Sequence, residues 1–146
     1  MKKVCIFCDG ACKGNPGPGG WAAILKYKDK KKIISGYLEH ATNNIMELTA
    51  AIKSLQQLKE PCEVNIYTDS QYVKRGIMEW LQRWKERSWK NSQKKPVKNQ
   101  ALWKTLDALC RKHNVHWHWI KGHEGQPENE ECDAIAKQEI EKNLAK

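Results

Sequence analysis

Five short segments of the chain carry the apolar, alternating patterns that are typical of β-strands with a buried face. They cover residues 3–9, 21–28, 33–39, 63–68 and 115–120. An Asp-Lys-Lys-Lys turn at 29–32 separates the second segment from the third, so we expect a hairpin there. A stretch rich in Gly and Pro at 10–20 predicts a long turn after the first strand.

Helical periodicity fills the gaps between these strands. One helix is expected within residues 42–60, ended by Pro61. Its apolar face is formed by Ile45, Leu48, Ile52 and Leu55. Further helices are expected at 70–80 (loosened by Gly76), 80–87, 100–113 and 127–143, with a polar loop at 88–99. Three early strands followed by alternating strands and helices are typical of an α/β domain built around a mixed sheet.

The size and composition indicate one globular domain. The chain has 146 residues, of which 40 % are hydrophobic, and we expect a single domain over 1–146. The sequence has no run of 18 apolar residues, which argues against a membrane-spanning helix. Asp9 interrupts the apolar N-terminal run, so we expect no signal peptide. The first strand starts by residue 3, so we expect no extra N-terminal domain before it.

Six cysteines raise the alternatives of disulfides or a zinc site. Cys5 and Cys8 form a C-x-x-C, but positions i and i+3 of a strand point to opposite faces, and the sequence has no second such motif. We therefore expect buried free thiols, which are typical of a reducing compartment, and a cytoplasmic protein.

Positive charge is concentrated in one segment. The chain has a formal charge of +9, and residues 74–98 contain nine Lys or Arg against two Glu. Trp80, Trp84 and Trp89 alternate with these cations. Two interpretations stay open at this point: a solvated helix face with Trp packed beneath it, or a groove that binds nucleic acid through phosphates and stacked bases.

Four isolated acids stand where strands end or helices run. Asp9 and Asp69 each end a strand-like run, Glu47 lies in the first turn of the 42–60 helix, and Asp133 lies in the last helix. Asp133 shares a helix side with small and apolar residues, so we expect its carboxylate to point inward without a cationic partner. Carboxylate oxygens of this kind suit Mg²⁺ or Mn²⁺.

Two of these acids also have a structural interpretation. Asn44 and Glu47 have the spacing of a capping box, in which Glu47 would bond the Asn44 amide. Asp69 and the following Ser70 could serve only as the N-cap of the next helix.

The remaining motifs are a histidine and a glycine pattern. His123 lies between glycines in a loop and could carry protons near neutral pH, whereas we expect structural roles for His116 and His118 on the last strand. The G-x-G-x-x-A at Gly17–Ala22 leads into a strand and not a helix, so it is not a dinucleotide fingerprint.

The motifs together resemble a known family. DGACKGNPGPGGW, TNNIMELTAAI, YTDSQYV, KKPVKNQALW and KGHEGQPENEECDAIA resemble, in order and spacing, the bacterial type 1 ribonucleases H, over roughly residues 2–140. The resemblance implies a ribonuclease H-like fold: a five-stranded mixed sheet, its first three strands antiparallel, flanked by helices. It also implies an endonuclease that cuts the RNA strand of RNA·DNA hybrids and leaves 3′-hydroxyl and 5′-phosphate ends.

The resemblance assigns roles residue by residue. The family's metal-binding carboxylates fall on Asp9, Glu47, Asp69 and Asp133, and its mobile catalytic histidine falls on His123. Contacts to the RNA fall on Asn15, Asn43, Asn44 and Gln71. A pocket for a DNA phosphate falls on Thr42, Asn44 and Asn99. The basic segment 80–98 is similar to the family's DNA-gripping handle, with Trp80, Trp84, Lys85, Arg87, Trp89 and Lys90 as its contacts.

We therefore expect a monomeric, cytoplasmic hybrid-specific ribonuclease that uses two Mg²⁺ ions about 4 Å apart, with Mn²⁺ as a possible substitute and no organic cofactor. Two alternatives remain: a module of the same fold that binds nucleic acid without cutting it, and a DNA exonuclease on this fold. Loss of an acid would favour the first, and none is lost.

Overall fold

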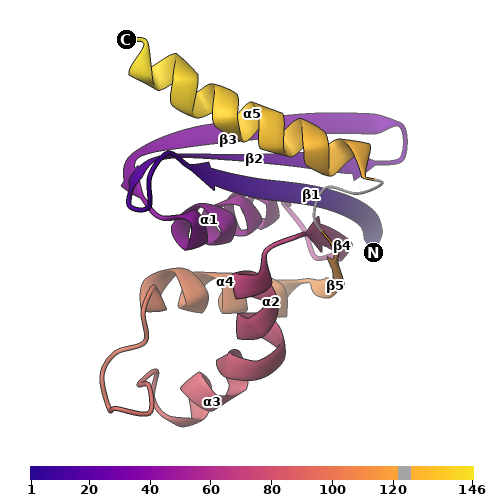
Figure 1. Ribbon diagram of the computed structural model, residues 1–146. Coiled ribbons are helices and arrows are strands. Elements are labelled where there is room, and N and C mark those ends of the chain that lie inside the picture. Colours follow the sequence, from indigo (N-terminus) through magenta and orange to yellow (C-terminus); the bar gives the residue numbers. More distant parts are fainter. Residues whose placement is uncertain (122–125) are drawn as a thin grey trace.

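A computed structural model describes residues 1–121 and 126–146 and contains a five-stranded sheet in the order β3-β2-β1-β4-β5 (Figure 1). The strands are β1 (Lys2–Cys12), β2 (Gly17–Tyr27), β3 (Lys30–Ala41), β4 (Cys62–Thr68) and β5 (Asn114–Trp119). The first three pair antiparallel, and β4 pairs parallel with β1 and with β5. This topology confirms the mixed sheet expected from the sequence.

Helices cover both faces of the sheet. They are α1 (Asn43–Gln56), α2 (Gln71–Arg75), the π-helical turn η1 (Gly76–Trp80), α3 (Leu81–Glu86), α4 (Gln100–Lys112) and α5 (Pro127–Leu144). α5 lies across β1, β2 and β3 on one face, α1 and α4 lie on the other, and α2 and α3 lead away from the sheet (Figure 1). In the described residues, no helix combines the length and the apolar character needed to cross a membrane.

Alternate residues of β1 supply the two apolar layers. Ile6 and Cys8 pack with α1 and β4, whereas Phe7 packs with Cys132 and Ala136 of α5. Cys5 and Cys8 therefore belong to opposite layers, as the strand pattern predicted. All six cysteines are free. Burial raises the pKa of the Cys132 thiol to about 12, so this thiol stays protonated and unreactive.

The turn predicted at 10–20 is wrong in its bounds, because the observed turn is shorter. β1 continues to Cys12 and β2 begins at Gly17, with Gly10 paired to Trp21 and Cys12 to Gly19. Strand pairing uses backbone groups, so a glycine-rich sequence can extend a ladder that side-chain patterns do not reveal. Pro61 likewise does not end the first helix, because α1 stops at Gln56 and a turn precedes β4.

The helix expected at 70–80 is interrupted where predicted. α2 gives way to the π-helical turn at Gly76. A Cβ atom at Gly76 would overlap the buried indole of Trp103 on α4. Gly76 thus allows this stretch to pack closely on α4, and α3 then carries the basic Trp-rich segment away from the sheet.

Candidate active site

Three of the predicted acids meet at one edge of the sheet. Asp9 lies near the carboxyl end of β1, Asp69 follows β4, and Glu47 lies in the first turns of α1. β1 and β4 run parallel, with Phe7 paired to Tyr67, so the acids that follow lie side by side. One carboxylate oxygen from each acid lies within 4.8 Å of the others. Such a cluster of oxygen ligands can hold a divalent cation.

Gly10 brings α1 against the end of β1. Its amide donates a hydrogen bond to Asp9 Oδ1 (2.9 Å) and another to Glu47 Oε1. A Cβ atom at Gly10 would lie 2.6 Å from the Met46 backbone, so a residue with a side chain would push the helix away. The absence of a side chain at Gly10 therefore lets the two carboxylates share one amide.

The predicted capping box of Asn44 and Glu47 is wrong, whereas the predicted N-cap at Asp69-Ser70 is confirmed for Ser70. Thr42 and not Asn44 caps α1, because its Oγ1 accepts a hydrogen bond from the Ile45 amide (3.1 Å). Ser70 caps α2 by accepting from the Val73 amide (3.1 Å). Glu47 and Asp69 are therefore not needed as caps, and their carboxylates are directed to the cluster instead.

Burial makes the cluster difficult to ionise fully. Burial, with the nearby charges of Asp69 and Asp133, raises the pKa of Asp9 from 3.8 to about 7. Burial and the Asp9 charge raise the pKa of Glu47 well above its ordinary value. Asp9 is 5 % exposed, and its Oδ2 has no hydrogen-bond partner among the described residues. A cation among these oxygens would neutralise the repulsion and give that atom a partner.

Asp133 joins the site more loosely. It lines the same hollow as the other three acids, a space of about 380 Å³, but it is not part of the tight cluster. Its Oδ2 lies 2.9 Å from Lys137 Nζ one helical turn away. The prediction that Asp133 lacks a cationic partner is therefore wrong.

The predicted histidine cannot be placed in this geometry, because His123 lies outside the described residues. The two histidines of β5 make contacts within the sheet, as expected. His118 Nε2 lies 2.8 Å from Asn65 Oδ1, and its ring stacks on Tyr67 at 4.5 Å. His116 Nε2 lies 3.5 Å from Glu63.

Comparisons with known proteins agree with this geometry. Residues 1–141 match the model of the RNase H family. The chain is 57 % identical to Ribonuclease H of Bradyrhizobium diazoefficiens, over 95 % of this chain and 90 % of that protein. It is 56 % identical to Ribonuclease H of Legionella pneumophila strain Corby, over 95 % and 97 %. The chain belongs to the RNase H family.

Solved structures support the same family. LC9-RNase H1, described as a type 1 RNase H with the type 2 active-site motif, superposes with a TM-score of 0.87 at 26 % identity. The match covers 97 % of this chain and 74 % of that one. As a member of the RNase H family, the chain is a ribonuclease H hydrolase, which confirms the enzyme class expected from its motifs.

The polar residues that the family resemblance assigns to substrate surround the acids. Asn43, Asn44 and Gln71 line the carboxylate hollow. Asn15 Oδ1 accepts a hydrogen bond from the Asn43 amide (3.1 Å), which ties the turn after β1 to the start of α1. The structure thus brings these four residues to the edge of the sheet where the acids lie.

Tyr72 also belongs to this region, and the sequence analysis did not select it. Its hydroxyl accepts hydrogen bonds from Asn99 Nδ2 (3.1 Å) and Trp103 Nε1 (2.9 Å). Tyr72 lines both the carboxylate hollow and a groove of about 350 Å³ on the basic segment. Its position in YTDSQYV, on the first turn after Asp69, was the available signal.

The groove beside Tyr72 contains only part of the predicted handle. Trp80, Trp84 and Arg87 line it, and Trp84 packs against Trp103 with ring centroids 5.4 Å apart. Trp89 stands 6.3 Å from Trp84 in the same aromatic row. The packing interpretation is confirmed, since Trp84 packs on Trp103 of α4. Cations also line a groove, and its binding of nucleic acid stays a prediction.

Two predicted handle cations lie outside the groove lining. Lys85 Nζ lies 3.4 Å from the buried Asp107 of α4, which makes it a structural ion pair. Lys90 is exposed and forms a β-bridge with Pro96.

Proposed function

We propose that this enzyme is an endonuclease that hydrolyses the RNA strand of RNA·DNA hybrids. The observation that carries the proposal is the cluster of Asp9, Glu47 and Asp69 oxygens within 4.8 Å, at an edge lined by polar side chains. Family membership supports it. A protein of the same fold, LC11-RNase H1, was solved in complex with an RNA/DNA hybrid; it has a TM-score of 0.72 at 20 % identity.

The donor set fits divalent magnesium, with manganese as a substitute. All the donors in the cluster are carboxylate oxygens, which hard cations prefer, and Asp9 Oδ2 is buried without a partner in the described chain. Asp9, Glu47, Asp69 and Asp133 would hold two ions. When bound, these ions would activate water and stabilise the charge that develops on the leaving oxygen.

The chain itself supplies position and proton control. The Gly10 amide fixes the carboxylates of Asp9 and Glu47. Because the pKa of Asp9 is raised to about 7, cation binding must displace its proton near neutral pH. We assign proton transfer at the leaving group to His123, which lies beyond the described residues. The products would carry 3′-hydroxyl and 5′-phosphate ends.

Substrate selection would use the polar rim and the basic groove. Asn15, Asn43, Asn44, Gln71 and Glu47 offer donors and acceptors to the 2′-hydroxyls that distinguish RNA from DNA. A DNA phosphate would bind near Thr42, Asn44 and Asn99. Trp80, Trp84 and Trp89, with the cations Lys85, Arg87 and Lys90, would hold the DNA strand by charge and stacking.

We also propose a cytoplasmic single-domain monomer. The six free thiols suit a reducing compartment, and helices pack on both faces of one sheet, as in a single domain.

The test measures cleavage of four substrates that share one sequence: RNA·DNA hybrid, double-stranded DNA, double-stranded RNA and single-stranded RNA. Each strand is end-labelled in turn. We expect Mg²⁺-dependent cuts inside the RNA strand of the hybrid, and fragments that a polymerase can extend because they end in a 3′-hydroxyl. Stepwise shortening from one end, or equal cutting of double-stranded DNA, would instead support an exonuclease or a general nuclease.

A further inference from the structure

Two histidines of β5 lie on a part of the sheet that α5 leaves uncovered. His116 and His118 are separated by one residue, so their side chains point to the same face of the strand. The His118 ring stacks on Tyr67, which stacks on Phe7, so this is the face on which α5 packs. However, α5 lies across β1, β2 and β3, and β4 and β5 lie beyond it (Figure 1). Ions in solution can therefore reach these imidazoles.

Glu63 on the neighbouring strand faces the same space. β4 and β5 pair parallel, with Asn65 beside His116, and Glu63 lies two residues before Asn65. Glu63 Oε1 lies 3.5 Å from His116 Nε2, and the Glu63 and His116 side chains are 33 % and 47 % exposed. Two ligands of one tetrahedral Zn²⁺ lie about 3.4 Å apart, because their bonds to the ion are about 2.0–2.2 Å long. The carboxylate and the imidazole thus already stand at the separation of two zinc ligands.

His118 is placed to supply a third ligand. Its Nε2 lies 2.8 Å from Asn65 Oδ1, and Asn65 is the residue paired with His116. The His118 ring therefore points back along the strand toward His116. For His118 to bind the same ion, its Nε2 must exchange the hydrogen bond to Asn65 for the metal, whereas Glu63 and His116 need little movement.

No lysine or arginine competes for Glu63 within the described residues. The other ion-paired acids of this chain, Glu60 and Glu128 among them, each have a lysine or arginine partner. Lys3 lies beside Glu63 in the register of β1 and β4, but the two form no ion pair in the described part of the chain. The partner of Glu63 is an imidazole, and a neutral imidazole is itself a zinc ligand.

We propose that Glu63, His116 and His118 bind one Zn²⁺ ion, with water as its fourth ligand. Zinc accepts imidazole nitrogens together with a carboxylate oxygen, whereas the all-oxygen carboxylate cluster suits Mg²⁺. The bound ion would join the edge strand β5 to β4.

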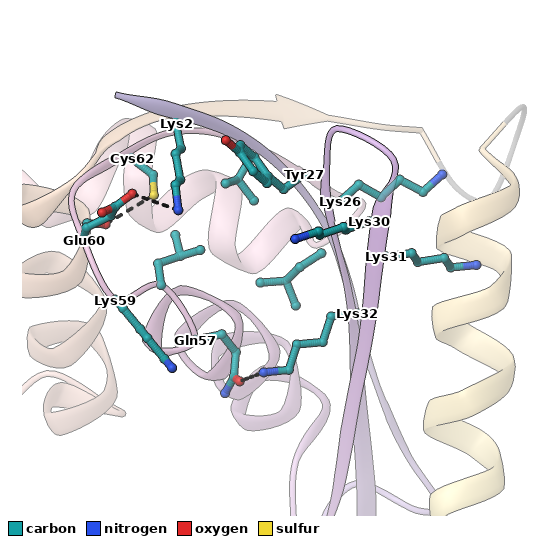
Figure 2. A pocket seen from close by; sticks show the side chains of 13 residues that line it. Lys2, Lys26, Tyr27, Lys30, Lys31, Lys32, Gln57, Lys59, Glu60 and Cys62 are labelled. Atoms are coloured by element: carbon teal, nitrogen blue, oxygen red, sulfur yellow. Dashed lines mark hydrogen bonds and ion pairs between the residues drawn. The ribbon is translucent and has the colours of Figure 1, made fainter.

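The zinc site is separate from the catalytic edge. Glu63 lies six residues before Asp69, which is about 20 Å along the strand at about 3.3 Å per residue. Glu63 also points to the opposite face of β4 from Cys62, which lines the hollow shown in Figure 2. Zinc can therefore bind without blocking the carboxylate hollow.

The first test is a calorimetric titration of the full chain, with its thiols reduced, with Zn²⁺ in excess Mg²⁺ as a competitor for the carboxylate cluster. We expect one saturable site, and at least about tenfold weaker binding in His116→Gln and in Glu63→Gln. His40→Gln is the control, because it removes an exposed imidazole from β3, and it should change the affinity less than about threefold. All four proteins should cleave a hybrid at equal kcat in Mg²⁺ alone. The absence of saturable binding, or equal affinity of the wild type and His116→Gln, would overturn the proposal.

The second test locates the ion. The NMR signals of the His116 and His118 imidazoles should shift with the first equivalent of Zn²⁺, and His118→Gln should weaken binding about tenfold. Asp9→Asn and Cys5→Ser should each keep the wild-type affinity within about threefold; Cys5 is a free thiol in register with Asn65. A loss in Asp9→Asn would place the ion at the carboxylate cluster, and a loss in Cys5→Ser would place it at a thiol. Either loss, or unchanged affinity in His118→Gln, would contradict the proposed ligand set.

Discussion

Lys137 Nζ lies 2.9 Å from Asp133 Oδ2, so the acid at the margin of the carboxylate hollow has its own cation one turn along α5. The hydrogen bond to Asp133 and the charge of Asp133 raise the pKa of Lys137. An ion that binds Asp133 must therefore compete with this ammonium group. We therefore expect Lys137 to limit how readily Asp133 binds a metal ion.

Removing that competitor should tighten metal binding. We expect Lys137→Met to lower the Mg²⁺ concentration for half-maximal activity by about two- to fivefold, because an exposed ion pair contributes at most about 1 kcal/mol. Lys142→Met is the matched control: it removes an equal charge from the same helix, where Lys142 pairs with Glu139 at 3.1 Å. An equal shift in both variants would mean that only net charge matters.

The buried cluster should cost stability when no cation is bound. The folded-state pKa of Asp9 is about 7 against 3.8 ordinarily, so the folded protein holds a proton that the unfolded chain releases. Stability should therefore fall as pH rises from about 4 to about 7. We expect Asp9→Asn in chelator at pH 8 to raise the melting temperature by several degrees. The upper bound is about 4 kcal/mol, from about 1.4 kcal/mol for each pKa unit.

The measurement is thermal unfolding of both proteins from pH 4 to pH 8, with and without Mg²⁺. The difference should disappear at pH 4 and shrink when Mg²⁺ is added. Asp107→Asn serves as a control of opposite sign, because Asp107 pairs with Lys85 (3.4 Å) and Arg111 (3.5 Å) and should lose stability on neutralisation. A lower melting temperature for Asp9→Asn at pH 8 would contradict the electrostatic description of the site.

The basic segment should supply affinity and not chemistry. We expect Arg87→Gln/Lys90→Gln to raise KM and to lower the log–log salt slope by about 1.8, at about 0.9 for each lost phosphate contact, with little change in kcat. Lys85 is left intact because neutralising it would also remove an ion-pair partner from the buried Asp107. Lys112→Gln/Lys146→Gln controls for charge. A loss of kcat at unchanged KM would place these cations in the catalytic step.

The sequence predicted the acids but not what holds them. The strand-like apolar patterns stop at Asp9 and Asp69, where the chain becomes polar. The local sequence was therefore enough to predict which end of the sheet carries these acids. The Gly10 amide shared by Asp9 and Glu47 could not be predicted in this way, because it depends on α1 packing against β1, and Glu47 is 37 residues from Gly10 in sequence. The Asp133–Lys137 pair was readable from its i,i+4 spacing, and it was missed.

The other features that the sequence did not predict depend on contacts between segments that are distant in sequence. The Lys85 contact to Asp107 joins two helices, and no periodicity within the basic segment points to it. A hollow of about 810 Å³ is formed by the start of β1, the hairpin of β2 and β3 and the turn before β4, so its residues range from Lys2 to Cys62 (Figure 2). Sheet register, which brings Lys2 beside Cys62 and Lys26 beside Cys5, creates this surface.

Strand choice should depend on several adjacent 2′-hydroxyls. The polar residues that line the carboxylate hollow come from two helices, α1 and α2, so we expect them to reach more than one nucleotide. Each unmade contact to a missing hydroxyl should cost about 1–3 kcal/mol. We expect cleavage of duplexes with one to about six consecutive ribonucleotides to rise steeply up to about four. Equal rates across the series would contradict recognition of the 2′-hydroxyl.

The central claim is that these carboxylates hold the ions for RNA cleavage. Its most direct test is a Mg²⁺ titration of hybrid cleavage by the wild-type enzyme and by Asp9→Asn. The affinity of both proteins for the hybrid is measured in parallel. We predict no wild-type cleavage in excess chelator, a loss of at least about 10³-fold in Asp9→Asn at every Mg²⁺ concentration, and hybrid affinities within about threefold of each other. Wild-type turnover in chelator, or near-normal cleavage by Asp9→Asn, would contradict the claim.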